Sequence, residues 1–395
     1  MPASPRDLRL DFFRGLALTL IFIDHIPENI LGYFTLQGVA PYDAAEVFIF
    51  ISGFTAALVY GRVLEESGAF YATAQVLRRA WQLYVAHIFL FVMFIAEVSY
   101  TVLTVNNPMY NEEMRIGSFL SQPHLAIIHG LLLQFQPAFL DILPLYIVLL
   151  LAFPLILIGF RQSVAAVLAG SLLLYGAVQT TGLSMPAYPP GRSWFFNPLA
   201  WQLLFAIGAA LGYGEVRGRR WTPRARVLLP GAVVIVAAAS AIKLSWTVHG
   251  LREALPALFV NELWPISKTN LSPARLIPFL ALVLVVGMLV PREAGFFRYR
   301  ASRQLILLGR HSLEVFCLGI LLSALGHFIL AEFDSGIAVQ LAVNAAGVLA
   351  MWLTAAIADW YKSMARGSSA RRPQRGGLEE HVEPIEVGEH KGIGG

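Results

Sequence analysis

Residues 140–160 read LDILPLYIVLLLAFPLILIGF, a run in which Asp141 is the single charged residue. A helix needs about 20 mostly apolar residues to cross the hydrocarbon core of a bilayer, so this run predicts a membrane-spanning helix. The chain as a whole shares the bias, because 57% of its 395 residues are hydrophobic and only 14% are charged. A soluble domain carries about a quarter charged residues. The surplus apolar surface therefore indicates lipid as its solvent.

Nine further runs of similar character predict an all-α, polytopic membrane bundle of about ten helices. The predicted spans are 10–29, 44–61, 80–104, 140–160, 163–181, 197–214, 227–247, 274–290, 304–330 and 336–361. The apolar stretch 124–134 is too short to span and is expected to be re-entrant or interfacial. The predicted membrane domain is thus 1–361. Residues 362–395, rich in Gly, Arg and Glu, are expected to form a disordered cytoplasmic tail.

Basic residues alternate between the predicted loops. Arginines cluster before the first span and after every second one, whereas the other loops hold few basic residues, chiefly Arg115, Arg192, Arg252 and Lys268. The positive-inside rule then places both termini in the cytoplasm. These clusters account for the net charge of +4 without indicating nucleic acid as a partner. The charged first run does not resemble a cleavable signal peptide.

Charged side chains in the first span indicate a face that cannot contact lipid. Residues 10–26 read LDFFRGLALTLIFIDHI. Arg14 and His25 are eleven positions apart, close to three helical turns, so both point to one side, about 16 Å apart along the axis. Asp11 and Glu28 continue the stripe and can pair with Arg14 and His25. Because ionisable groups are costly in a membrane, this face is expected to line a protein interior or a wet cavity.

The stripe predicts an anion site at one end and a proton acceptor at the other. Arg14, near the cytoplasmic end, is suited to a phosphate. His25, near the outer end, is suited to act as a general base toward a hydroxyl, with Asp24 or Glu28 orienting its ring. The alternative is that both residues are buried structural pairs that fix helix packing, and spacing alone does not separate the two readings.

Other polar residues near these two ends complete the candidate site. Glu46 either orients His25 as a catalytic partner, binds the acceptor, or is a simple interfacial carboxylate. Arg78 and Arg79 either bind donor phosphates or anchor the helix in the positive-inside manner. Ser52 with Gly53 permits close helix approach. The supporting candidates are Asp11, Glu28, Ser52, Tyr84, His87, His311, Ser312 and Glu314, and the candidates for holding an external acceptor are Asn197, Glu262 and Trp264.

Several kinds of site are not expected. One cysteine, Cys317, cannot form an internal disulfide or a cysteine-based zinc site. The scattered histidines have no metal-ligand spacing, so no metal is predicted. The chain contains no Gly-rich phosphate loop, zinc-protease helix or serine-hydrolase elbow. Trp264 has a second interpretation as part of the interfacial aromatic belt.

The motifs resemble known membrane enzymes. Arg14 followed after ten residues by His25 resembles the signature of the transmembrane acyltransferase type 3 superfamily. FIFISGF at 48–54 resembles that superfamily's Phe-Phe-x-x-Ser-Gly-Phe motif, with Ile49 at the second aromatic position. Five segments in order resemble the OpgC family: RLDFFRGLAL at 9–18, FIDHIP at 22–27, AEVFIFISGF at 45–54, FNPLAWQLLF at 196–205 and LGRHSLEVF at 308–316. The similarity runs from the first predicted span to the ninth, and the chemistry is expected to take place within the membrane part, without an attached extracellular hydrolase domain.

The resemblance implies succinylation of osmoregulated periplasmic glucans at the bacterial inner membrane. The donor would be succinyl-CoA, a co-substrate rather than a resident cofactor, and the acceptor a glucose hydroxyl in the periplasm. His25 would match the catalytic histidine, Arg14 the motif arginine, and Arg79 a basic position at the start of span three that meets the CoA phosphates. Direct transfer and an acyl-histidine intermediate both stay open. The identity of the acyl group (succinyl or acetyl), the exact glucan and the oligomeric state also stay open.

The rival hypothesis is a secondary transporter or flippase for a polar or lipid-linked substrate. Ten spans and intramembrane charge fit that class as well. However, the sequence has no pair of short, broken spans in corresponding halves, and its charges concentrate in the first two spans. The sequence therefore favours the acyltransferase.

Overall fold

The computed structural model describes residues 7–105, 108–218, 223–246 and 266–370. This part of the chain is almost entirely helical, as predicted, with one short antiparallel hairpin formed by β1 (Pro186–Ala187) and β2 (Arg192–Ser193). The α-helices are α1 (Leu8–Asp24), α2 (Leu36–Val39), α3 (Ala44–Ser67), α4 (Ala69–Val105), α5 (Pro108–Glu113), α6 (Gly117–Ser121), α7 (Pro123–Leu131), α8 (Ile142–Gln162), α9 (Val164–Thr181), α10 (Pro198–Val216), α11 (Pro223–Ser245), α14 (Pro273–Leu289), α15 (Arg300–Arg310), α16 (Ser312–Glu332) and α17 (Ile337–Ala370). Two 3-10 turns are η1 (Ile30–Phe34) and η2 (Gly295–Arg298).

Ten of these helices correspond to the ten predicted spans. Within the described residues, eight are long and apolar enough to cross a membrane: α3, α4, α8, α9, α10, α11, α16 and α17. The other two, α1 and α14, have 17 residues each. Helix α7, in the stretch predicted to be re-entrant or interfacial, has nine residues and is too short to span. The chain is therefore a multi-pass membrane protein with an all-α bundle.

The largest differences from the predicted spans concern α4, α17 and the span at 304–330. The predicted span 304–330 is divided at His311, where α15 ends and α16 begins. Helices α4 and α17 extend past their predicted limits, α4 starting at Ala69 and α17 continuing to Ala370. Hydropathy marks the part of a helix that suits lipid, and it does not show how far the helix continues beyond that part. Helix α17 therefore includes the first residues of the predicted tail, while 371–395 lie outside the described residues.

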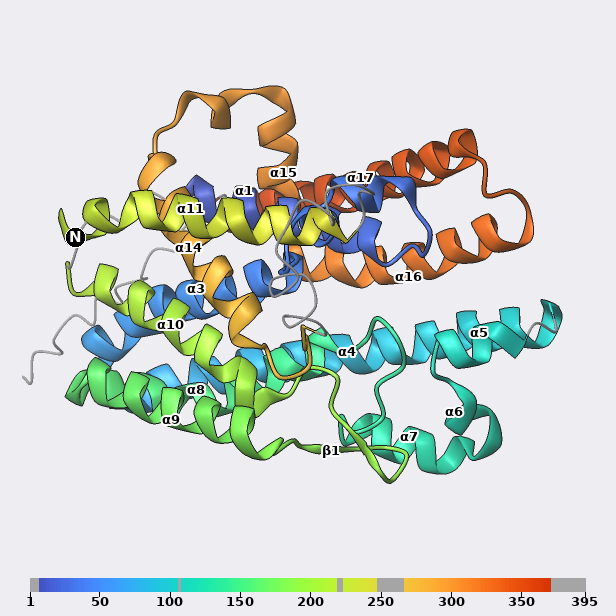
Figure 1. The fold of residues 1–395 in the computed structure, drawn as a ribbon, viewed down its shortest axis with the longest axis horizontal. Coiled ribbons are helices and arrows are strands. Elements are labelled where there is room, and N and C mark those ends of the chain that lie inside the picture. The colour runs from blue at the N-terminus through green and yellow to red at the C-terminus, as the bar shows by residue number, and fades with distance from the viewer. Residues whose placement is uncertain (1–6, 106–107, 219–222, 247–265, 371–395) are drawn as a thin grey trace, which may run out of the picture.

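Glycines bring two helix pairs into backbone contact. A Cβ on Gly53 of α3 would lie 2.2 Å from the Phe205 carbonyl oxygen of α10. A Cβ on Gly15 of α1 would lie 1.8 Å from the Leu305 carbonyl oxygen of α15. Both distances are shorter than real Cβ contacts, so only glycine fits at these crossings. The close approach predicted at Ser52–Gly53 is confirmed, and it fixes α3 against α10 in the middle of the bundle (Figure 1).

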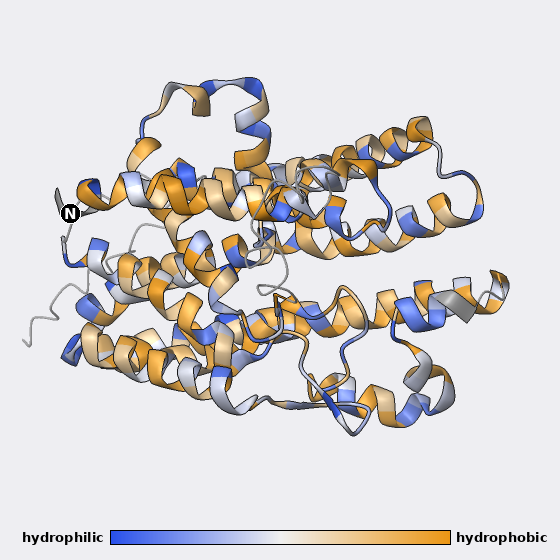
Figure 2. Ribbon diagram, viewed as in Figure 1, coloured by the Kyte–Doolittle hydropathy of each residue, from blue (hydrophilic) through white to orange (hydrophobic). Residues whose placement is uncertain are grey.

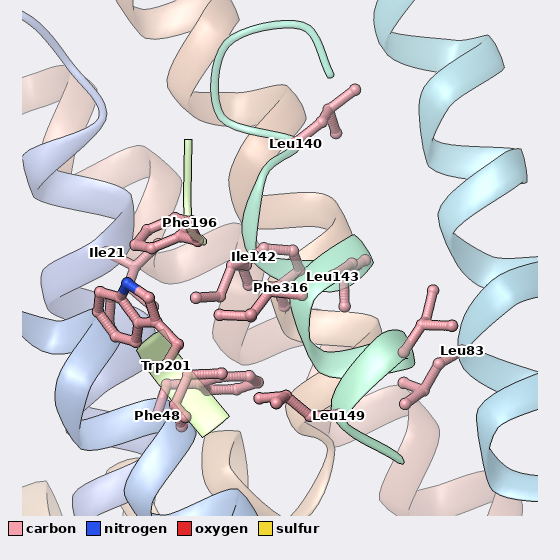
Figure 3. Packing of buried hydrophobic residues seen from close by; sticks show 14 of the residues in the cluster. Ile21, Phe48, Leu83, Leu140, Ile142, Leu143, Leu149, Phe196, Trp201 and Phe316 are labelled. Carbon is pink, nitrogen blue, oxygen red and sulfur yellow. The ribbon is translucent and has the colours of Figure 1, made fainter. Parts of the chain in front are cut away.

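Hydrophobic residues make up most of the long helices, and hydrophilic residues are commonest toward helix ends and loops (Figure 2). Large hydrophobic residues such as Phe89, Leu155 and Leu173 are more than half exposed, which suits a surface in contact with lipid. The core lies where several helices converge. Figure 3 shows buried side chains from different helices facing one another there, among them Phe48, Leu83 and Phe316.

Candidate functional site

A cavity of about 200 Å³ opens among α1, α3, α4, α8 and α16. We call it the Arg14 cavity. Arg14 and Arg79 contribute its two guanidinium groups. The rest of the lining is mostly apolar, with a few hydroxyls: Phe48, Ser52, Thr55, Ala56, Val59, Tyr60, Leu83, Leu143, Tyr146, Ser312, Leu313 and Phe316. The fold thus brings together four residues predicted from separate segments, Arg14, Ser52, Arg79 and Ser312.

Hydrogen bonding orients Arg14. Its Nη2 donates to Thr55 Oγ1 at 2.8 Å, and Nη1 lies 4.0 Å from Asp11 Oδ1. Asp11 is buried and is also 3.9 Å from the Nε of Arg310 on α15. The predicted pairing of Asp11 with Arg14 is therefore present. It holds the guanidinium in a fixed place at the cavity wall.

The structure separates the two arginines at the start of predicted span three. Consecutive residues on a helix point about 100° apart. Arg79 is half-buried and lines the Arg14 cavity, whereas Arg78 is exposed and does not line it. Of the two predicted donor-binding arginines, Arg79 is thus the one placed to meet a ligand in this cavity.

Four other supporting candidates lie outside the cavity lining. The Tyr84 hydroxyl donates to the Leu131 carbonyl at the end of α7, at 2.9 Å. The His311 ring and the Glu314 carboxylate both face α17. There, Lys362 Nζ lies 3.2 Å from His311 Nδ1 and 3.4 Å from Glu314 Oε1. His87 is 1% exposed, one turn beyond Leu83 on α4. Neither of its ring nitrogens has a hydrogen-bond partner among the described residues.

His25 follows the last residue of α1, at the opposite end of that helix from Arg14. Its Nδ1 lies 2.5 Å from the Ile21 carbonyl oxygen, so we assign the hydrogen to Nδ1 and the lone pair to Nε2. The ring packs edge-on against Phe139, with 4.8 Å between ring centroids. This tautomer presents Nε2 as a proton acceptor, the state that a general base requires.

The carboxylates predicted to orient His25 do not bond to it among the described residues. Asp24 Oδ1 is buried without a hydrogen-bond partner in that part of the chain, and Glu28 is exposed with a left-handed backbone, φ 56°. Glu46 is fully buried, and its oxygens accept hydrogen bonds from Asp43 N at 2.9 Å and Arg275 Nε at 2.7 Å. The backbone carbonyl of Ile21 orients the imidazole instead. Glu46 caps α3 and pairs with Arg275, and no hydrogen bond joins it to His25 among the described residues.

Beside His25 lies a charged cluster that the sequence did not reveal. Lys268 Nζ lies 2.7 Å and Arg275 Nη2 3.1 Å from the same oxygen of Asp43. Burial alone would raise the pKa of the Asp43 carboxyl, but Lys268 and Arg275 hold that pKa well below its usual range. Lys268 also acts electrostatically on both Asp24 and His25. The cluster therefore places opposing charges, from Lys268 and Asp43, near His25.

Arg115 and Asp141 extend this charged region. Arg115 Nη2 lies 3.2 Å from Asp141 Oδ2, and burial raises the pKa of Asp141 to about 6 against the opposing effect of Arg115. The Arg115 guanidinium lies 5.3 Å from the centre of the Phe195 ring, and Lys268 Nζ lies 5.9 Å from the same ring. Phe195 thus connects the two ion-paired groups. In the sequence, Arg115 and Lys268 stood out only as two of the few basic residues in loops that otherwise contain few.

The predicted acceptor-binding residues have different outcomes. Asn197 is fully buried, accepts from Leu199 N at 3.1 Å, and donates to the Leu183 carbonyl and Asn270 Oδ1. It caps α10 and fixes the adjoining loops, and both hydrogens of its side-chain amide are bonded within the protein. Glu262 and Trp264 lie outside the described residues. Within the described part of the chain, no group of three or more His, Cys, Asp or Glu side chains could hold a metal ion.

Fold and site together define a polytopic membrane protein with a two-arginine cavity inside its helical core and a histidine within a charged cluster at the far end of α1. The chain belongs to the OpgC protein family, whose model matches residues 6–363. The match covers every helix described above except the final residues of α17, and it confirms the resemblance found in the sequence. No curated protein and no solved structure matched the chain.

Proposed function

We propose that this protein is a transmembrane O-acyltransferase that moves a succinyl group from cytoplasmic succinyl-CoA to hydroxyls of periplasmic glucans. One observation carries the proposal: helix α1 places Arg14 in a cavity and His25 in a charged cluster eleven residues further on, in a chain of the OpgC family. Eleven helical residues extend about 16 Å. A long, flexible donor arm is therefore needed to connect an anion bound at Arg14 with a reaction at His25.

The Arg14 cavity suits the donor. Arginine binds phosphate oxygens through several parallel hydrogen bonds, so Arg14 and Arg79 would hold the CoA phosphates. The apolar walls at Leu83, Leu143 and Phe316 would pack against the carbon chain of the arm. CoA acts here as a co-substrate that enters loaded and leaves as the free thiol.

His25 would perform the chemistry. Its Nε2 takes the proton of a sugar hydroxyl, and the hydroxyl oxygen attacks the thioester carbonyl carbon. The C–S bond then breaks, an ester forms on the sugar, and the imidazolium returns the proton to the departing thiolate. In the covalent alternative, Nε2 attacks the thioester carbonyl carbon first, the C–S bond breaks and the CoA thiolate leaves. The sugar hydroxyl then displaces the acyl group from the ring, and its proton passes to the thiolate. Quenching the reaction without acceptor and mapping His25 by peptide mass spectrometry distinguishes the two routes.

The test is glucan modification in cells. The wild type and His25→Ala are expressed in a strain that lacks its own glucan succinylation, and the periplasmic glucans are weighed by mass spectrometry. We expect succinylated glucan with the wild type and with Arg78→Gln as the control, and none with His25→Ala at equal membrane levels. Equal modification by His25→Ala would make His25 structural. Unmodified glucan with the wild type would contradict the proposal, and labelled-substrate uptake would then test the transporter alternative.

A further inference from the structure

A second cavity, of about 450 Å³, is separate from the Arg14 cavity. We call it the hairpin cavity, because the β1–β2 hairpin forms one wall. The turn between α5 and α6 and the segment after α7 form the others (Figure 1). Its polar lining includes Asn111, Arg115, Gln134, Gln136, Tyr188 and Arg192. Its volume is within the range of about 300–1,000 Å³ that small-molecule sites occupy.

Specific contacts fix the walls of the hairpin cavity. Tyr188 N donates to the Gln134 carbonyl at 2.9 Å, which joins the hairpin to the segment after α7. The His129 ring stacks on the Tyr188 ring, with centroids 4.2 Å apart, and its Nδ1 lies 2.6 Å from Gln134 Oε1. Arg115 and Leu133 have left-handed backbone conformations, φ 54° and 61°. Such strain in non-glycine residues is typical of ligand sites.

The lining has the chemistry of a sugar site. The side-chain amides of Asn111, Gln134 and Gln136 can both donate and accept hydrogen bonds, as the neighbouring hydroxyls of a pyranose do. The aromatic rings of Tyr188 and Phe195 offer faces to the apolar C–H side of such a ring. Asn111 Oδ1 is buried and has no hydrogen-bond partner among the described residues. A buried acceptor of this kind favours a ligand that brings a donor.

The charges of the cavity do not favour an anion. Its arginines are offset by the Glu112 carboxylate in the lining and by Asp141, which pairs with Arg115 at 3.2 Å. Neutral amide and hydroxyl groups make up most of the remaining polar wall. A neutral polyhydroxylated ligand therefore fits better than a phosphate or a carboxylate.

The hairpin cavity adjoins the charged cluster at His25. Arg115 lines the cavity and pairs with Asp141, two residues after Phe139, whose ring packs against His25 with 4.8 Å between ring centroids. We propose that the hairpin cavity binds a neutral glucose oligosaccharide stretch of the acceptor and presents a neighbouring hydroxyl to His25. This inference rests on the proposed function for the reaction, although binding itself does not require catalysis.

Oligosaccharide binding and transfer kinetics test the inference with the full-length protein in nanodiscs. Isothermal titration measures binding of a linear glucose oligosaccharide to the wild type, Tyr188→Ala and Asn111→Ala. Tyr33→Ala is the matched control, because Tyr33 is 63% exposed and does not line the cavity. We expect Kd to rise about tenfold in both cavity variants, because each loses roughly one hydrogen bond or ring contact to the ligand. In the control, Kd should be unchanged.

Kinetics separates acceptor binding from a general defect. In both cavity variants the KM for the glucan should rise about tenfold while the KM for succinyl-CoA is unchanged. Unchanged acceptor Kd and KM in both variants would overturn the inference, as would an equal effect of Tyr33→Ala. Cavity-dependent binding without any acyl transfer by the wild type would refute the proposed function and leave the sugar site standing.

Discussion

Replacing Arg79 with glutamine should weaken donor binding, while the same change at Arg78 should not. Arg79 lines the Arg14 cavity and Arg78, its neighbour on α4, is exposed outside it. A hydrogen bond to a charged group contributes about 1.5–3 kcal/mol, or roughly 10- to 100-fold in affinity. Arg79 is only half-buried, so solvent screening favours the lower end of that range. We expect the KM for succinyl-CoA to rise about tenfold in Arg79→Gln.

The assay is succinyl transfer by purified protein in nanodiscs, with glucan saturating and succinyl-CoA varied. Arg78→Gln is the matched control, since it removes the same charge one residue away, and its donor KM should stay within about twofold. An equal rise in both variants would show that general surface charge attracts the donor. No rise in either would make Arg79 a positive-inside anchor and refute its assignment to the donor site.

Three further predictions concern stability. Gly53→Ala should lower the melting temperature, because the new methyl group would force α3 away from α10. Gly170→Ala is the control and should not lower it, because the space around Gly170 is open. Equal melting temperatures of the two variants would contradict the backbone contact. Arg275→Met should destabilise the fold by about 3–5 kcal/mol, because it leaves the buried Glu46 carboxylate without its ion-pair partner. Adding Glu46→Leu should recover part of the lost stability. A wild-type melting temperature for Arg275→Met would refute this prediction. Because burial raises the pKa of Asp141 from 3.8 to about 6, the folded state holds this proton more tightly than the unfolded state, so stability should fall as pH rises from about 4 to 6. Asp141→Asn should flatten that part of the melting profile, and an unchanged slope would contradict the assignment.

The features that could be predicted from sequence are local ones. The ten helices follow from runs of apolar residues, and the Arg14–His25 stripe follows from helical periodicity within α1. The division at His311 could not be predicted, because it depends on α15 packing along α1, where Gly309 touches the Asp11 backbone. No proline marks the division, and the only local sign of it is that Arg310, His311 and Ser312 interrupt the apolar run.

The surroundings of His25 depend on contacts between distant segments. Asp43 meets Lys268 and Arg275 across more than 200 residues, and no local pattern indicates which loops come together. The same limit explains Glu46, whose place at the outer end of its helix suggested a partner for His25. A charge buried away from water needs a partner, and in this fold the Glu46 carboxylate pairs with Arg275. Sequence therefore identified His25 as a candidate catalytic residue but not the groups that surround it.

Helix α4 completes the connection between the two ends of the site. On one face it presents Arg79 and Leu83 to the Arg14 cavity, then His87 a turn later, and then Phe94. The Phe94 ring contacts Phe139, with centroids 6.3 Å apart, and Phe139 contacts His25. Helices α1 and α4 thus both lead from the cavity to the histidine. His87, buried between the two ends with both ring nitrogens unpartnered among the described residues, is costly in a membrane interior unless a ligand satisfies it.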